Sequence, residues 1–120
     1  MEIIIIKEPI DRQEVGEMAK KQFGDVIKAV VDIDKKIMAI GPELHSDGEI
    51  FLEEKEDSKR ENIWGINLYP EQDDLIEFDS VINLKPSLGN RSRDVEDVEI
   101  KEKIREIVNN LIIQRCNIKN

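Results

Sequence analysis

The stretch "VIKAVVDIDKKIMAIG", residues 26–41, contains two apolar runs separated by Asp34, Lys35 and Lys36. Short apolar runs rich in β-branched residues, with a polar break between them, are typical of two strands joined by a turn. The break lacks the glycine that most favours a tight hairpin turn. The pattern still predicts an antiparallel β-hairpin, and the rest of the fold is inferred outward from it.

The segment before this hairpin predicts one strand and one helix. Ile3 to Ile6 form a continuous β-branched run, which is typical of an interior strand buried on both faces. Asp11 is a candidate N-cap, and apolar residues follow it at helical spacing. A helix is therefore expected from about Arg12 to Phe23, ended by Gly24.

The segment after the hairpin predicts three strands and a second helix. Strands are expected in "EIFLEE" (49–54), in "NIWGINLYP" (62–70) and in "LIEFDSVINL" (75–84), and residues 54–62 are expected to form a solvated loop. In the last strand the alternation places apolar side chains on a buried face: Ile76, Phe78, Ile82 and Leu84. From Asp94 onward a helix is expected, with apolar residues on one face: Ile100, Ile104, Ile107, Val108 and Leu111.

This order of elements predicts an α+β fold: a mainly antiparallel sheet of about five or six strands, with the N-terminal and C-terminal helices packed on one face. The length of 120 residues suits one hydrophobic core, so residues 1–120 are expected to form one domain, with residues 117–120 frayed. Abundant Ile, Glu and Lys with few Ala is a bias found in heat-adapted proteins and equally in AT-rich genomes.

Composition limits the partners. The net charge of −9 makes nucleic-acid binding unexpected, because such a protein repels phosphate backbones. The one cysteine, Cys116, cannot form an internal disulfide, and the apolar run in "MEIIIIKE" is too short to be a membrane span or a signal peptide. A soluble, cytoplasmic protein without a membrane partner is expected.

The motif "GPELHSDGE", residues 41–49, is the first candidate site, because it contains the only histidine in the chain. In an extended chain, side chains at every second position share one side, which would give a row of ligands for a divalent metal: Glu43, His45, Asp47 and Glu49. Gly48 and Ser46-Asp47 favour a turn, which would break this row. The alternatives are a general acid/base site, in which Asp47 or Glu43 orients His45, and a solvated polar connection.

The loop "KPSLGNRSR", residues 85–93, is the second candidate site, because it is basic and contains no acid. Arg91 and Arg93 match the geometry of a carboxylate or phosphate, and the following helix presents its positive end. Acidic residues in the first turns of that helix oppose an anion, and the arginines can instead form salt links.

These segments together resemble a family of small prokaryotic proteins known only as a domain of unknown function. The likeness runs from about Val31 to Leu111, with one departure at Pro42, where the family pattern has glycine. It rests on the histidine motif, a Trp-Gly-x-Asn-x-Tyr-Pro strand and a Pro-x-x-Gly-Asn-Arg-Ser loop, and its matching residues are Glu43, His45, Asp47, Glu49, Trp64, Gly65, Asn67, Tyr69, Pro70, Asn83, Pro86, Gly89, Asn90, Arg91 and Ser92. The resemblance implies candidate residues and no activity.

The polar residues of this pattern predict one shared cleft, lined by His45 and Asp47, by Asn67 and Tyr69, and by Asn90 and Arg91. Arg93, from the same basic loop, is a further candidate ligand-binding residue. Two functions fit such a cleft. The first is a binding or interaction module, which binds an anionic small molecule or meets a basic partner through its acidic surface, with a homodimer across an exposed sheet edge as one form. The second is a small hydrolase, metal-assisted or dependent on His45 with Asp47 and Glu43, that acts on an anionic small molecule. A nuclease of the small toxin kind is disfavoured by the negative charge.

Overall fold

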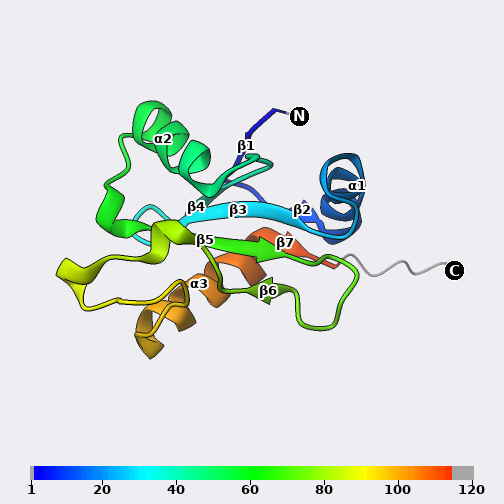
Figure 1. Ribbon diagram of the computed structural model, residues 1–120. Coiled ribbons are helices and arrows are strands. Elements are labelled where there is room, and N and C mark those ends of the chain that lie inside the picture. Colours follow the sequence, from blue (N-terminus) through cyan, green and yellow to red (C-terminus); the bar gives the residue numbers. More distant parts are fainter. Residues whose placement is uncertain (1, 115–120) are drawn as a thin grey trace, which may run out of the picture.

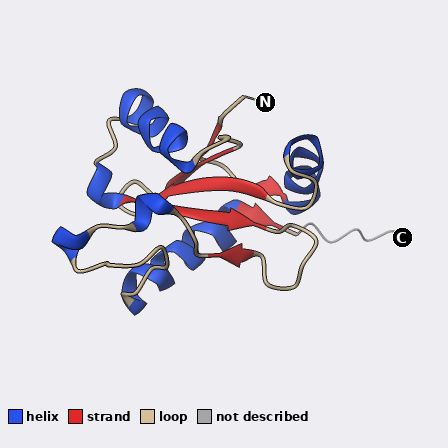
Figure 2. Ribbon diagram, viewed as in Figure 1, coloured by secondary structure: helices blue, strands red, loops and turns tan. Residues whose placement is uncertain are grey.

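The structure is a computed structural model, and it describes residues 2–114. Its centre is a five-stranded antiparallel sheet with the strand order β1-β4-β3-β5-β6 (Figures 1 and 2). The strands of this sheet are β1 (Ile4–Ile6), β3 (Ile27–Asp32), β4 (Ile37–Ile40), β5 (Ile63–Leu68) and β6 (Ile76–Glu77). Two further strands, β2 (Ile10–Asp11) and β7 (Ile112–Ile113), form a small parallel sheet. The predicted α+β fold with a mainly antiparallel sheet is confirmed.

Strands β3 and β4 form the predicted hairpin, with Val30 opposite Ala39 and Asp32 opposite Ile37. The turn closes without glycine because the Asp32 side chain accepts hydrogen bonds from the backbone amides of Asp34 and Lys35, at 2.9 and 3.0 Å. Lys36 supplies the left-handed backbone conformation, with φ of 60°. Hydrogen bonds from the turn amides to the Asp32 side chain therefore stabilise a turn in which glycine is the usual residue.

Two helices cover one face of the sheet, as predicted. Helix α1 (Arg12–Gln22) begins at the N-cap Asp11, and α3 (Val98–Leu111) begins at the N-cap Asp97. Their buried side chains join a large cluster with the side chains that point to the same face of the sheet, among them Ala29, Val31 and Ile66. This cluster is the main core of the protein.

The opposite face is covered by a helix that the sequence did not predict, α2 (His45–Glu56), which lies across the sheet from α3 in Figure 1. The strand expected over residues 49–54 is therefore wrong, and the histidine motif enters this helix at His45. Gly48 faces the sheet: a Cβ built there would lie only 3.0 Å from Val30 Cγ2 and 3.1 Å from Pro42 Cγ. The glycine thus permits close packing between helix and sheet, and the turn that it suggested does not form. Residues 54–62 likewise contain the end of α2 and a 3₁₀ turn, η1 (Arg60–Asn62).

Two other expectations about strands are wrong. Strand β1 lies at the edge of the sheet, and Ile4 is 36% exposed, so it is not an interior strand. An edge strand can pair with another chain, and the homodimer stays a prediction. The strand expected over residues 75–84 ends at Glu77 and gives way to a 3₁₀ turn, η2 (Val81–Asn83), followed by η3 (Pro86–Leu88).

The predicted alternation is reversed at the end of this segment, since Leu84 is 44% exposed whereas Asn83 is fully buried. The reason is that strand β5 pairs with β6 only at Asn67 and Leu68. At Gly65 the Asn83 side chain takes the place of a neighbouring strand: it accepts from Gly65 N at 2.8 Å and donates to Gly65 O at 3.0 Å. A side-chain amide satisfies the backbone there, so no further strand is needed.

Candidate functional site

His45 is the first residue of α2 and lies against strand β5. Its Nε2 is 2.8 Å from the Ile66 carbonyl oxygen, which can only accept, so Nε2 carries a proton and donates it to that oxygen. Gly65 makes this approach possible, because a Cβ at that position would lie 3.1 Å from His45 Cδ2 and 2.5 Å from Ser80 Oγ. The glycine of the Trp-Gly-x-Asn strand therefore creates the space that the imidazole and Ser80 occupy.

Burial lowers the pKa of His45 below its ordinary value of 6.5, because the charged imidazolium loses water there. The hydrogen bond to Ile66 and the neighbouring Asn67 side chain act in the opposite direction and more weakly, although Asn67 Oδ1 itself makes no hydrogen bond of normal geometry. Nearby Lys28 lowers the pKa further. In the neutral ring Nδ1 is then the acceptor.

His45 lines a cavity of about 440 Å³ at the N-terminal end of α2. Lys28 comes from β3 and Asn67 from β5, and these two residues are directly opposite each other in the sheet. Ser46 comes from α2, and Arg93 comes from the long segment that follows β6. Residues far apart in the sequence thus meet in one cavity.

The cavity combines three features that favour an anion. Lys28 and Arg93 are cations, and Arg93 Nε is 2.6 Å from Asp79 Oδ1, which leaves the other nitrogens of the guanidinium free of that bond. Leu44 precedes α2 and offers no side-chain cap, so no side chain accepts hydrogen bonds from the first amides of the helix. A helix N-terminus carries partial positive charge, and it adds to the two cations.

Arg93 is positioned by hydrogen bonds of buried side chains and backbone. Its carbonyl oxygen accepts from Asn83 Nδ2 at 2.9 Å and from the amide of Ser80 at 3.1 Å. The loop around it is held by Asn90, which is 4% exposed and bonds to the backbone of four residues: Asn83, Ser92, Asp94 and Glu96. Asn90 is thus an organiser of the loop.

Of the residues predicted for the cleft, His45 and Asn67 line one cavity, and the candidate ligand-binding residue Arg93 lines it with them. Five others lie elsewhere. Glu43 and Asp47 are exposed and do not line the cavity, and Tyr69 donates a hydrogen bond to Glu77 at 3.2 Å. Asn90 is engaged within the loop, and Arg91 is exposed, with its amide donating to Glu96.

The predicted metal row does not assemble. Within residues 2–114 no group of three or more His, Cys, Asp or Glu side chains is placed to hold a metal ion. Because the motif is helical, Asp47 points to solvent while Glu49 is buried and lies 3.7 Å from Arg60 Nε.

Sequence reasoning missed Lys28, Asp79 and Ser80, which also line the cavity. Lys28 had a visible signal: it is the one charge inside the apolar run "VIKAVV". Asp79 and Ser80 were assigned to the predicted strand over residues 75–84, which ends before them, at Glu77.

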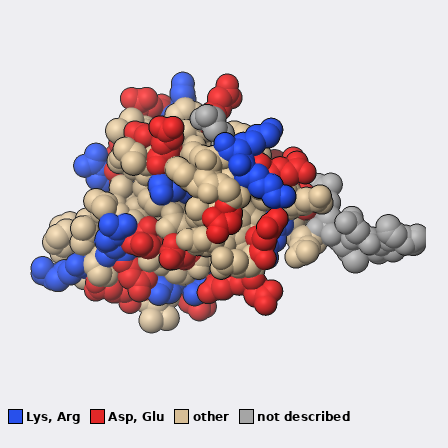
Figure 3. Space-filling view, turned by 45° about the vertical axis from the view of Figure 1, so that its right-hand side comes forward, with Lys and Arg blue, Asp and Glu red and all other residues tan. Residues whose placement is uncertain are grey.

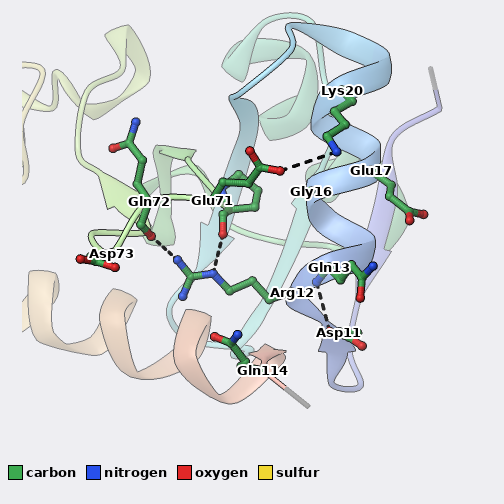
Figure 4. A pocket seen from close by; sticks show the side chains of 11 residues that line it. Asp11, Arg12, Gln13, Gly16, Glu17, Lys20, Glu71, Gln72, Asp73 and Gln114 are labelled. Atoms are coloured by element: carbon green, nitrogen blue, oxygen red, sulfur yellow. Dashed lines mark hydrogen bonds and ion pairs between the residues drawn. The ribbon is translucent and has the colours of Figure 1, made fainter. Parts of the chain in front are cut away.

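A larger cavity, of about 620 Å³, lies between α1 and residues 70–73 (Figure 4). Its cations are already engaged. Arg12 donates to the carbonyl oxygens of Pro70 and Gln72, and Lys20 is 3.6 Å from Glu71. In the His45 cavity Arg93 is likewise paired, with Asp79, but among the described residues Lys28 forms no ion pair. The His45 cavity is therefore the better candidate for a ligand.

The fold and the cavity define a small α+β protein with a cationic cavity at a helix N-terminus. The chain belongs to the family described as "Protein of unknown function (DUF5674)", which matches residues 4–111. No curated protein and no solved structure matches it. Among the described residues no helix is long and apolar enough to cross a membrane.

Proposed function

We propose that the protein binds a small molecule through a phosphate or carboxylate group held in the His45 cavity. The observation that carries this proposal is the meeting of Lys28, Arg93 and the uncapped N-terminus of α2 around one cavity. Hydrogen bonds between an oxyanion and a guanidinium, an ammonium or a helix amide are charge-assisted, which makes them stronger than neutral ones. The predicted anion site is thus retained, with Arg93 in place of Arg91.

His45 lines this site with its second ring nitrogen. Since Nε2 donates to Ile66, Nδ1 is the nitrogen that remains for the ligand. A negative charge bound beside the ring favours its protonated form, so the anion raises the pKa of His45. Ligand binding is thereby coupled to the ionisation of this one side chain.

Attraction of an anion depends on local charge. Acidic and basic side chains are interspersed on the face that Figure 3 shows, and the whole chain carries −9. Long-range steering is therefore weak, and the cations of the cavity supply the favourable interaction at short range. With its single cysteine, the protein is proposed to act in the cytoplasm.

The geometry of His45 supports binding over hydrolysis. A catalytic histidine is commonly oriented by a carboxylate. Here the Ile66 carbonyl orients the ring, while Glu43 and Asp47 are exposed and outside the cavity. Binding requires only the cations and amides that already surround the cavity.

The test is a calorimetric titration with inorganic phosphate and, separately, with acetate. The wild-type protein is expected to bind at least one of them, and Lys28→Met and Arg93→Met are each expected to weaken that binding by about tenfold or more, because each removes a charge-assisted hydrogen bond. Lys35→Met is the matched control, since Lys35 is an exposed lysine of the β3–β4 turn and its loss changes the net charge equally. Binding of neither anion, or equal weakening by Lys35→Met, would contradict the proposal.

A further inference from the structure

A second cavity, of about 420 Å³, lies beside the His45 cavity, and the two share Ile82 in their walls. It is bounded by α2, by η1 and by residues 82–88. His45 and Glu49 are one turn apart on α2, so the first turn of the helix lines one cavity and the next turn lines the other. The residues used below to describe this second cavity are Glu49, Arg60, Glu61, Leu84, Lys85 and Leu88.

Lys85 is a buried cation without a carboxylate partner. It is 8% exposed, its Nζ donates to the Arg60 carbonyl oxygen at 3.0 Å, and it lies 5.2 Å from the centre of the Trp64 ring. In the part of the chain that the structure describes, no carboxylate oxygen lies within 4.0 Å of Nζ. An ammonium has three donors, so this one has hydrogen-bonding capacity left toward the cavity.

Glu49 is the buried carboxylate of the same cavity, and it is 7% exposed. Burial raises the pKa of Glu49 and lowers that of Lys85, while the charge of each partner acts on the other in the opposite direction. The two groups are thus within electrostatic reach of each other without direct contact. Glu49 is paired only with the exposed Arg60, whose Nε lies 3.7 Å away, and Lys85 forms no ion pair among the described residues. The two buried charges are thus weakly compensated, and a molecule that bridges them would stabilise both.

The remaining wall is apolar and open to solvent. Leu84 is 44% exposed and Leu88 is 51% exposed, and both line the cavity. They lie on either side of Lys85 in the sequence, so the buried ammonium is flanked by apolar surface. A ligand that fits this wall has an apolar part next to its charged group.

We infer that the second cavity binds a small zwitterion with an apolar side chain, an aliphatic α-amino acid or a molecule with the same groups. Its carboxylate accepts hydrogen bonds from Lys85, its ammonium donates to Glu49 with Glu61 nearby, and its side chain packs against Leu84 and Leu88. The cavity lies within the range of about 300–1,000 Å³ that is usual for small-molecule sites.

The charges of the cavity select a zwitterion over a simple anion or cation. The lining contains two cations, Arg60 and Lys85, and two carboxylates, Glu49 and Glu61. A lone anion meets repulsion from the carboxylates, and a lone cation meets repulsion from Lys85 and Arg60. The His45 cavity differs, because its one acid, Asp79, is already paired with Arg93.

The probe for this inference is L-leucine, titrated into the full chain and followed by calorimetry and by tryptophan fluorescence. Trp64 is the only tryptophan and lies against Lys85, so its emission reports on the cavity. Leucine is expected to bind saturably. The half-ligands 4-methylpentanoate, which lacks the amine, and 3-methylbutylamine, which lacks the carboxylate, are each expected to bind at least about tenfold more weakly, because each loses one charge-assisted contact.

Leu88→Asp is the test variant, because it places a charge on the exposed apolar wall without touching a buried group, and it is expected to weaken leucine binding at least tenfold. Val98→Asp is its matched control, since Val98 is 72% exposed on α3 and outside the cavity. Arg93→Met, which impairs the His45 cavity, should leave leucine binding unchanged. The test of the second cavity is therefore independent of the test of the anion site. The inference would be overturned if leucine gave no saturable heat of binding. It would also be overturned if either half-ligand bound as tightly as leucine, or if Leu88→Asp bound leucine as tightly as the wild type does.

Discussion

The two faces of the sheet are built from different kinds of side chain. Under α1 and α3 the sheet is buried by a large, continuous apolar cluster that includes Ile66 and Ile104. Under α2 the apolar cluster is much smaller, and polar residues are buried around it, among them Glu49, Ser80 and Asn83. One face therefore supplies most of the hydrophobic stabilisation, and the other holds polar groups in fixed positions.

The polar face holds together because most of its buried groups are hydrogen-bonded. Asn83 makes three hydrogen bonds to the backbone of Gly65 and Arg93, which fixes the segment that carries Arg93 to strand β5. An unsatisfied buried group would cost about 1–3 kcal/mol. His45 and Lys85 each have hydrogen-bonding capacity left over, and each lines one of the two proposed ligand cavities.

The largest expected effect is on the apolar face. Ile104→Ala removes a fully buried side chain of α3, and the free energy of unfolding should fall by about 2–5 kcal/mol, measured by urea denaturation. Phosphate binding by the folded protein should not change. The matched control is Glu102→Ala, an exposed residue of the same helix, with an expected change within about 0.5 kcal/mol. If the free energy of unfolding fell no further in Ile104→Ala than in the control, the apolar face would not be the main source of stability.

A smaller effect is expected from Gly65→Ala on the polar face, with a loss of stability of about 1–3 kcal/mol from overpacking. The new Cβ would lie 2.6 Å from Ser80 Cβ and 3.1 Å from His45 Cδ2, so phosphate binding should weaken as well. Gly16→Ala in α1 is the contrast: the nearest atom outside α1 would be 3.6 Å away, and helix propensity should stabilise the protein by up to about 1 kcal/mol. If Gly65→Ala and Gly16→Ala changed the free energy of unfolding equally, the proposed difference between the two faces would be contradicted.

The smallest effect is the dependence of stability on pH. Because burial lowers the pKa of His45 below 6.5 in the folded state, the unfolded state binds this proton more readily. The contribution of neutral His45 is therefore complete above pH 6.5 and is lost as the pH falls through the lower folded pKa. Between about pH 7 and pH 5 the wild type should lose more stability than His45→Gln, in urea denaturation at each pH. Parallel profiles would mean that His45 is not buried as described.

The sequence predicted the elements whose signals are local. The hairpin follows from two β-branched runs, and the N-terminal helix from Asp11 and the apolar spacing after it. Helix α2 was missed because its sheet-facing positions are His45, Gly48, Glu49 and Leu52, which have helical spacing but are mostly not apolar. The period-two series of acids in the same motif suggested an extended chain, and tertiary packing overrode that pattern.

The candidate site was predictable in part. His45 and Asn67 were placed together because neighbouring segments of an antiparallel sheet bring polar groups to one face. The choice between Arg91 and Arg93 depends on which carbonyl Asn83 binds and on the hydrogen bonds of Asn90, and these contacts across the chain leave no periodic signal. The same contacts ended the strand that the alternation predicted over residues 75–84.

The most direct test of the anion site is an NMR titration of the His45 ring, which is unambiguous because the chain has one histidine. In the free protein its pKa should lie below 6.5. Inorganic phosphate should raise that pKa in the wild type and have a much smaller effect in Arg93→Met, because the bound anion favours the imidazolium and Arg93 holds the anion. A pKa that is the same with and without phosphate, or an equal rise in Arg93→Met, would contradict the proposed site.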